Sequence, residues 1–220
     1  MAFTLTELQS VSKYGSDTDL PSFTSTSGEL LLLSIVRRRN DLPSSIGATH
    51  GIFTLVDSVS GSNRLVACYA CISTGATGGL SISFPSSNTG AASVVEVAGA
   101  DNASVAAAIV QSNTLDQYNG GGGSHTNTVA LSPFASATNA TFLIGQSSGT
   151  TTPEAGYTEV THNNDIYAWY KLSEDTTPSF NTAGNFTRVK AVAIEIQEAS
   201  GGGGVSIPVI MNQLRNQGIS

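Results

Sequence analysis

The sequence is poor in charged residues, aromatic residues and cysteine. Of its 220 residues, 11% are charged, 7% are aromatic and two are cysteines. Sixteen acidic residues against nine basic ones give a net charge of -7. An acidic protein repels nucleic-acid phosphates and anionic lipid headgroups, so we expect neither a nucleic acid nor a membrane as a partner. Two cysteines give no disulfide framework and are typical of a reducing cytoplasm.

Long apolar stretches are also missing. The longest run, Leu30 to Val36, is interrupted by Ser34 and is much shorter than the roughly 20 residues that cross a bilayer. The first seven residues lack the basic start and the long apolar segment of a secretory signal. We therefore expect a chain that is made and folded in a cytoplasm, without a membrane anchor.

Strand and turn signals recur along the chain, whereas helix signals are scarce. Thirty Ser, 24 Thr and 23 Gly favour strands and turns over helices. Several apolar runs alternate with period two, which is typical of strands with one buried face. The predicted strands are 3–11, 29–37, 51–59, 63–73, 79–84, 92–98, 105–111, 126–132, 140–146, 155–161, 165–172 and 186–197. The pattern predicts an all-β protein, an antiparallel β-sandwich with jelly-roll-like topology.

The two ends of the chain are expected to be appendages of this sandwich. Residues 1–27, rich in Ser and Thr, predict an N-terminal arm with a first strand, and residues 28–200 predict the sandwich itself. Four glycines at 201–204 predict a hinge before a tail that ends at Ser220. The apolar side chains of the predicted assembly tail are Ile207, Val209, Ile210, Met211 and Leu214. Such a tail either folds back on its own domain or docks on a neighbouring chain, and the reach of the hinge favours the neighbour.

Two short motifs resemble sites of catalysis or redox chemistry. Gly145 to Gly149 matches the G-x-S-x-G nucleophile elbow around Ser147, but a Thr-rich segment ending in Pro153 follows where the elbow needs a helix. Cys68 and Cys71 form a C-x-x-C inside an apolar strand, where their sulfurs point to opposite faces. We therefore expect no catalytic residue, and a protein that is not an enzyme.

Metal, cofactor and anion sites have little support in the sequence. The three histidines are isolated, and the glycine runs lack the Lys-Ser/Thr ending of a phosphate loop. Small acidic clusters, such as Asp17 with Asp19 and Glu174 with Asp175, lack the spacing of a calcium loop and are typical of turns. The three adjacent arginines at 37–39 are expected to solvate a strand end or to pair with carboxylates rather than to bind an anion. We expect no metal and no cofactor.

The densest group of aromatic residues is at 167–170. Tyr167 and Trp169 share one face of a predicted strand, and Tyr170 shares the other face with Ile166 and Ala168. The first face is a candidate surface aromatic contact that could stack on a sugar ring. The alternative is that Trp169, the single Trp, anchors the core or a subunit contact, and this alternative is favoured.

Four stretches of the chain resemble a known family. They are GELLLLS at 28–34, FTLVDSV at 53–59, SVVEVAGAD at 93–101 and FASATNATF at 134–142. In order and spacing they resemble a β-sandwich domain that recurs in tailed-bacteriophage structural genes, among head decoration (cement) proteins and other virion surface proteins. The resemblance extends over about residues 25–198 and contains no catalytic signature.

The resemblance implies a virion structural protein that binds the major capsid protein and its own copies, often as a homotrimer. It implies a location on the phage head surface after synthesis in the bacterial host cytoplasm. The expected function is that of a capsid decoration protein, which stabilises the head by protein contacts. The alternative is a carbohydrate-binding or host-attachment module of a phage tail or a secreted protein.

Overall fold

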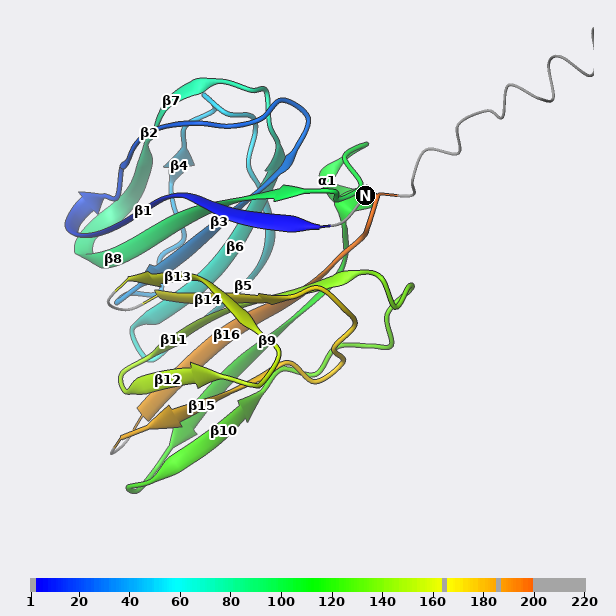
Figure 1. Ribbon diagram of the computed structural model, residues 1–220. Coiled ribbons are helices and arrows are strands. Elements are labelled where there is room, and N and C mark those ends of the chain that lie inside the picture. The colour runs from blue at the N-terminus through cyan, green and yellow to red at the C-terminus, as the bar shows by residue number, and fades with distance from the viewer. Residues whose placement is uncertain (1–2, 164–165, 185–186, 200–220) are drawn as a thin grey trace, which may run out of the picture.

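The fold is all-β and antiparallel, as the sequence predicts. The computed structural model describes residues 3–163, 166–184 and 187–199, and these form sixteen strands and one four-residue helix. Every strand pair among them is antiparallel. The strands form two large sheets that pack face to face, which confirms the predicted β-sandwich (Figure 1).

The first sheet is built around a strand that is buried on both faces. Its order is β1 (Thr4–Asp17), β8 (Ile82–Ala98), β3 (Leu30–Arg37), β6 (Arg64–Ile72) and β5 (Thr54–Gly61), with β4 (Ser45–Ile46) pairing with β8. All residues of β3 are buried, as expected for a run that is apolar on both faces. A tight turn joins β5 to β6, and its residues Ser62 and Asn63 both have positive φ, the geometry that matches the strand twist.

The second sheet has the same form. Its order is β13 (Thr158–Asn163), β14 (Ile166–Lys171), β11 (Ala140–Ser147), β16 (Thr187–Ile196) and β9 (Ile109–Asn119). The central strand β11 is buried throughout, like β3. Just before β9 lies α1 (Val105–Ala108), whose first turn is capped by the Ser104 hydroxyl accepting from the Ala107 N–H at 3.1 Å.

The two sheets have the same topology, so the chain contains an internal structural duplication. Read from β1 and from β9, both sheets place their first, fifth, second, fourth and third strands side by side. The registers agree as well: Leu31 lies between Cys71 and Glu96, and Thr141 lies between Lys171 and Glu195.

Equivalent residues also have equivalent roles in the two halves. The carboxylates of Glu96 and Glu195 each bond the loop that precedes the central strand of their sheet. Glu96 accepts from the Thr26 N–H at 2.6 Å, and Glu195 accepts from the Ala135 N–H at 3.0 Å. Each half therefore uses the same device to fix the entry of its central strand.

An inner core lies between the two sheets and joins them into one unit. It contains alternate residues of the central strands, Leu30 and Leu32 from β3 and Phe142 and Ile144 from β11. The alternation follows from the pleat, which sends successive side chains to opposite faces. The remaining faces of both sheets are also apolar, so each needs a further cover.

Short strands supply these covers and give the molecule four layers (Figure 1). The two-stranded sheet of β2 (Leu20–Thr24) and β7 (Thr77–Leu80) covers the first sheet, with Phe23 and Leu80 in the core between them. A small sheet of β10 (Ser124–Thr128), β15 (Ser179–Ala183) and β12 (Thr150–Pro153) covers the second sheet, where Phe180 packs on Trp169.

Two expected features of the first part of the chain differ from the structure. The segment expected to be an N-terminal arm with a first strand has that strand, but β1 is longer than predicted, pairs with β8 from Thr4 to Asp17 and is followed by β2, so the segment belongs to the sandwich. Residues 105–108, expected to begin a strand, form α1 because Ser104 caps a helical turn. The predicted assembly tail at 201–220 lies outside the described residues, as do its apolar side chains Ile207, Val209, Ile210, Met211 and Leu214.

Candidate functional site

A groove lies where the two sheets meet at one edge of the sandwich. It has a volume of about 590 Å³ and is lined by Thr54–Val56 of β5, Ser104–Ala106 at α1 and Ile109–Ser112 of β9. β5 is the last strand of the first sheet, and β9 is the last strand of the second. The groove therefore runs between two sheet edges, and its size is in the range of ligand pockets, about 300–1,000 Å³.

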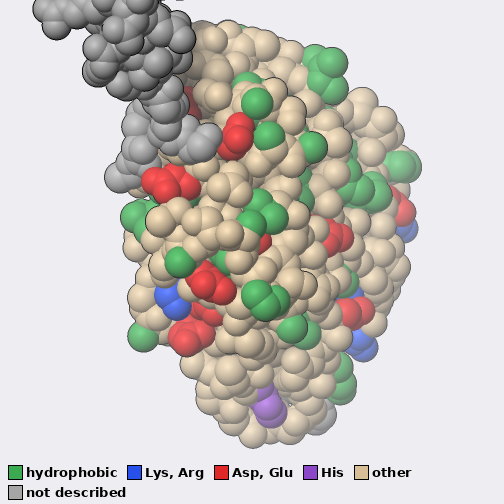
Figure 2. Space-filling model, turned by 90° about the vertical axis from the view of Figure 1, so that its right-hand side faces the viewer, with side chains coloured by type: hydrophobic (Ala, Val, Ile, Leu, Met, Phe, Trp, Pro, Cys, Tyr) green, Lys and Arg blue, Asp and Glu red, His purple; other side chains and the backbone are tan. Residues whose placement is uncertain are grey.

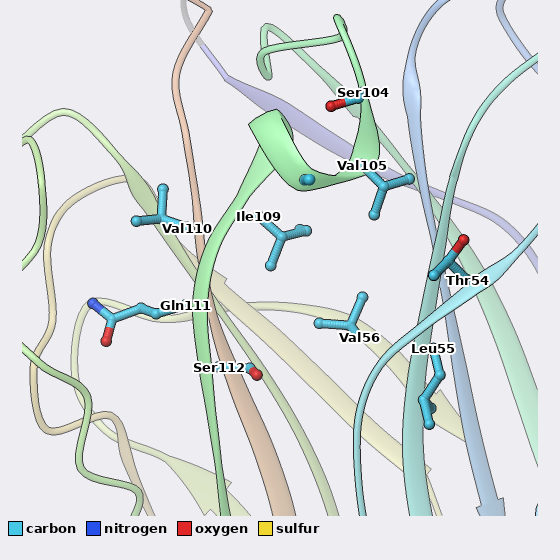
Figure 3. A pocket seen from close by; sticks show the side chains of 10 residues that line it. Thr54, Leu55, Val56, Ser104, Val105, Ile109, Val110, Gln111 and Ser112 are labelled. Atoms are coloured by element: carbon cyan, nitrogen blue, oxygen red, sulfur yellow. The ribbon is translucent and has the colours of Figure 1, made fainter.

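The groove is apolar inside, and its lining also includes the polar residues Thr54, Ser104, Gln111 and Ser112. Figure 3 shows Val56, Val105 and Ile109 pointing toward one another from three different elements. Leu55 and Val110, which also line the groove, remain 41% and 42% exposed. Exposed apolar side chains gathered at a groove are typical of a surface that binds a partner.

Because the two halves have the same topology, the groove can be compared with the equivalent position at the opposite edge of the sandwich. The opposite edge of the sandwich is the seam between β1 and β13, which corresponds to the seam between β9 and β5. At that seam the Thr161 hydroxyl donates to Glu7 Oε2 and also bonds the Ser93 hydroxyl at 2.7 Å. The opposite seam is therefore closed by a hydrogen-bonded bridge between the sheets.

The residues at the groove are shorter or less buried than their counterparts at the closed seam. By register, Ser112 occupies the position of Glu7, and a serine side chain is too short to bridge the sheets as the glutamate does. Ile109 occupies the position of Leu5, which is buried, whereas Ile109 is half-buried. The groove is thus a seam that lacks the bridging side chain of its counterpart.

Ser147, the serine of the G-x-S-x-G motif, ends β11 and is buried. Its hydroxyl accepts a hydrogen bond from the Gly149 N–H at 3.0 Å, and β12 follows at Thr150. The expected absence of a helix after the serine is confirmed, so this turn lacks the helical support of a nucleophile elbow.

Cys68 and Cys71 are free and buried on opposite faces of β6, as predicted. Burial raises the pKa of both thiols, that of Cys71 to about 12. Burial acts here because it disfavours the charged thiolate. At neutral pH both side chains are therefore neutral thiols packed as small apolar groups.

A serine–histidine cluster that the sequence analysis missed lies beside the two-stranded sheet β2–β7. The Ser25 hydroxyl lies 3.0 Å from His50 Nδ1 and accepts from the Ser73 hydroxyl at 2.7 Å. His50 Nε2 lies 3.0 Å from the Gly78 carbonyl oxygen, which accepts its N–H, and Phe23 stacks on the ring at 3.9 Å. All three polar side chains are buried, so the cluster links the β2–β7 sheet to the first sheet. No sequence signal links these residues, because 25 and 23 positions separate them.

The arginines at the end of β3 have different environments. Arg37 is buried, with its guanidinium 3.8 Å from the centre of the Phe84 ring and donating to the Ser86 carbonyl. This burial differs from the expected solvated strand end, and desolvation lowers the pKa of Arg37. Arg39 pairs with Asp41 at 3.9 Å on the surface, which confirms a carboxylate partner for this arginine.

Tyr167 and Trp169 do not form a surface contact. Trp169 is fully buried and Tyr167 is 6% exposed, because the small sheet carrying Phe180 covers this face of β14. The rings of Tyr167 and Trp169 stack with centroids 5.7 Å apart. Their shared face was predicted correctly, and the favoured alternative, that Trp169 anchors the core, is confirmed. The candidate surface contact is wrong because β15, which the sequence did not predict, covers this face.

Among the described residues, two exposed tyrosines lie elsewhere, on the edge strands β1 and β9. Tyr14 is 72% exposed and Tyr118 is 55% exposed. Their registers with Thr89 and Arg188 make them equivalent positions of the two halves. The sequence analysis missed both, because each is an isolated aromatic residue in a polar segment.

The acidic clusters act in turns and local ion pairs. Asp19 accepts from the Ser81 hydroxyl at 2.7 Å, and Asp175 accepts from Lys171 Nζ and the Tyr157 hydroxyl, both at 3.1 Å. Burial and the nearby Asp175 charge raise the pKa of Tyr157. Within residues 3–163, 166–184 and 187–199, no group of three His, Cys, Asp or Glu side chains is placed to hold a metal ion.

Comparison of the chain with family models, curated proteins and solved structures gives no match. No helix formed by the described residues has both the length and the apolar character needed to cross a membrane.

Proposed function

We propose that this chain is a structural protein that acts by protein contact, as a decoration protein on the capsid of a tailed bacteriophage. In this role it binds the major capsid protein and further copies of itself. The observation that carries the contact role is the apolar groove between the sheet edges β5 and β9, with Leu55 and Val110 exposed at its rim. The phage setting is supported by the family resemblance of the sequence.

One face of the molecule carries a mixture of side-chain types. On the face shown in Figure 2, apolar side chains are scattered among polar atoms, and acidic side chains are more frequent than basic ones. Ile52, which precedes β5, is an apolar side chain that is 82% exposed. Burial of such a patch against a partner gains roughly 25 cal/mol per Å² of apolar surface, before the costs of association.

Binding to capsids that lack the protein tests this proposal. Purified protein is mixed with such capsids, and bound protein is measured by co-sedimentation and by the temperature at which the capsids disrupt. We expect saturable binding and a higher disruption temperature. Leu55→Asp should weaken binding by about tenfold or more because it places a charge on an apolar contact. Leu172→Asp, which changes a 51% exposed leucine away from the groove, is the matched control. Absence of saturable binding would reject the decoration role.

The exposed tyrosines favour a second candidate function, recognition of a carbohydrate. Tyr14 and Tyr118 present aromatic rings at equivalent positions, and the Arg188 guanidinium lies 5.1 Å from the centre of the Tyr118 ring. A glycan array with wild-type protein, Tyr14→Ala and Tyr118→Ala tests this function. Specific binding that is lost in both variants, with unchanged thermal stability, would support a host-attachment module in place of a decoration protein.

A further inference from the structure

We propose that the groove between β5 and β9 receives the apolar segment 205–211 of a second copy of this chain. This inference rests on the proposed contact function and names the partner of the same site. Two observations lead to it: the shape and edges of the groove, and the place where the described chain stops.

The described chain stops beside the groove. The Gln197 N–H donates to the Ala108 carbonyl at 2.8 Å, and the Ala199 N–H donates to the Gly99 carbonyl at 2.8 Å. Ala108 belongs to α1, whose residues Val105 and Ala106 form one wall of the groove (Figure 3). The 21 residues that follow, 200–220, therefore start at the end of the molecule where the groove lies.

The sequence of the following segment suits a groove between strand edges. Val205, Ile207, Val209 and Met211 alternate with Ser206, Pro208, Ile210 and Asn212, so in an extended chain the first set shares one face. That face matches an apolar groove. Pro208 lacks an N–H, which an added edge strand tolerates where the missing donor points away from the sheet. The only charged side chain at 200–220 is Arg215, whose sign is opposite to the net charge of -7.

The direction of the strands favours a second copy over the chain's own segment. β16 and β9 are antiparallel, so the chain leaves β16 at the end where β9 begins. A segment that pairs antiparallel with β9, as every described strand pair does, must enter at the far end of the groove. It would place Val205 about 20 Å from α1, at 3.3 Å per residue.

The chain's own linker is too short for that path. The six steps from Ala199 to Val205 reach at most about 21 Å when fully extended, which leaves no residue for the necessary reversal. The corresponding segment of a neighbouring molecule enters from the other end without a reversal. Adding a strand to an exposed sheet edge is a common mode of recognition, in which main-chain hydrogen bonds give affinity and alternate side chains give specificity.

Self-association in the absence of capsids is the first test. We compare the full chain, residues 1–200, Leu55→Asp, Val110→Asp and the control Leu172→Asp by sedimentation velocity across a range of concentrations. We expect the full chain and the control to associate, and the truncated chain and both groove variants to associate about tenfold more weakly or worse. Far-UV circular dichroism verifies that each variant is folded, and two groove variants are made so that one folding failure does not remove the test. A full chain that is monomeric at all concentrations would overturn the proposal.

A complementation experiment separates exchange between copies from other forms of association. The truncated chain supplies a groove without the segment, and the full-length Val110→Asp chain supplies the segment without a functional groove. We expect each to be monomeric alone and the mixture to form a mixed species. If the mixture stays monomeric while the wild type associates, the contact is a different one and the proposal is wrong. Failure of capsid binding with intact self-association would reject the decoration role alone.

Discussion

At the scale of single residues, Lys190 and Asp116 form an ion pair whose two side chains differ widely in burial. Nζ of Lys190 lies 2.6 Å from Asp116 Oδ2, and the lysine side chain is 1% exposed whereas the aspartate is 53% exposed. The lysine lies on β16 facing the space between the sheets, and its charge there depends on the aspartate. Removing the partner of a buried charge leaves that charge uncompensated, which costs far more than removing a surface pair.

We expect Asp116→Ala to lower the free energy of unfolding by about 1–3 kcal/mol, the usual cost of an unpaired buried polar group. The matched control is Arg39→Ala, which removes the 3.9 Å surface pair with Asp41 and should cost less than about 1 kcal/mol. Urea unfolding followed by circular dichroism measures both. Equal effects of the two substitutions would show that Lys190 does not depend on its partner.

We predict that the reactivity of the two buried thiols depends on folding and on pH. Cys68 and Cys71 should not react with a thiol reagent in the folded protein at pH 8, because their raised pKa values keep them protonated and burial blocks access. Both should react after unfolding in guanidinium. The pKa of the Cys71 thiol is 9.0 in the unfolded chain and about 12 in the folded protein. Between these values only the unfolded state ionises, so the free energy of unfolding falls as pH rises through this window. Rapid labelling of the folded protein at pH 8 would contradict the buried placement.

At the scale of elements, β1 shows why an edge strand can look like an arm. It is rich in Ser and Thr, and most of its residues are half-buried or exposed, so its sequence lacks the apolar density of a central strand. In the structure it covers the edge of β8 and brings Phe3 and Leu5 into the inner core. A covered edge also protects β8 from pairing with other chains.

Deleting residues 1–18 should therefore prevent folding, whereas deletion of an arm would not. The deletion removes the pairing along β8 and the burial of two large apolar side chains, against a total stability of about 5–15 kcal/mol for a typical domain. We expect an insoluble or unfolded product, measured by soluble yield and far-UV circular dichroism. A soluble product with a native spectrum would show that β1 is dispensable.

The long apolar strands were predictable, and the polar ones were not. The run at 30–36 predicted a strand buried on both faces because nothing but a central position hides it, and β3 is that strand. The short strands β2, β4, β12 and β15 were missed because their Ser, Thr, Asn and Pro residues give the same signal as turns. The missed β15 is the reason that Trp169 was considered a surface candidate.

The groove could not be predicted, because its two walls are about 50 residues apart in sequence. Neither Thr54–Val56 nor Ile109–Ser112 is unusual alone, and only the packing of the sheets brings them together. The apolar segment after Gly204 could be recognised in the sequence, but the groove near which the described chain ends could not.

At the scale of the whole molecule, the inner core makes the two halves dependent on each other. Alternate residues of β3 and β6 pack against alternate residues of β11 and β16, so neither sheet has a solvent-compatible face without the other. Separation of the halves would expose this shared surface to water, which is strongly unfavourable. The halves are similar in topology, but they form one folding unit.

We expect a single cooperative unfolding transition. Trp169 fluorescence reports on the second half, and far-UV circular dichroism reports on all strands, so the two signals should change at the same denaturant concentration. The first half alone, residues 1–101, should not fold as a monomer. Two separated transitions, one without a change in Trp169 fluorescence, would show that the halves unfold independently.

The matched topology of the halves is what duplication of a half-length gene followed by fusion produces. A separate half-chain would pair as a two-fold homodimer, and that symmetry would force both of its seams to be identical. Fusion removes the constraint, so Glu7 bridges one seam while Ser112, its counterpart, leaves the other without this bridge. A fused chain can thus carry a binding surface on one side only. Copies joined through such a surface assemble head to tail, and closure of that head-to-tail contact gives a ring.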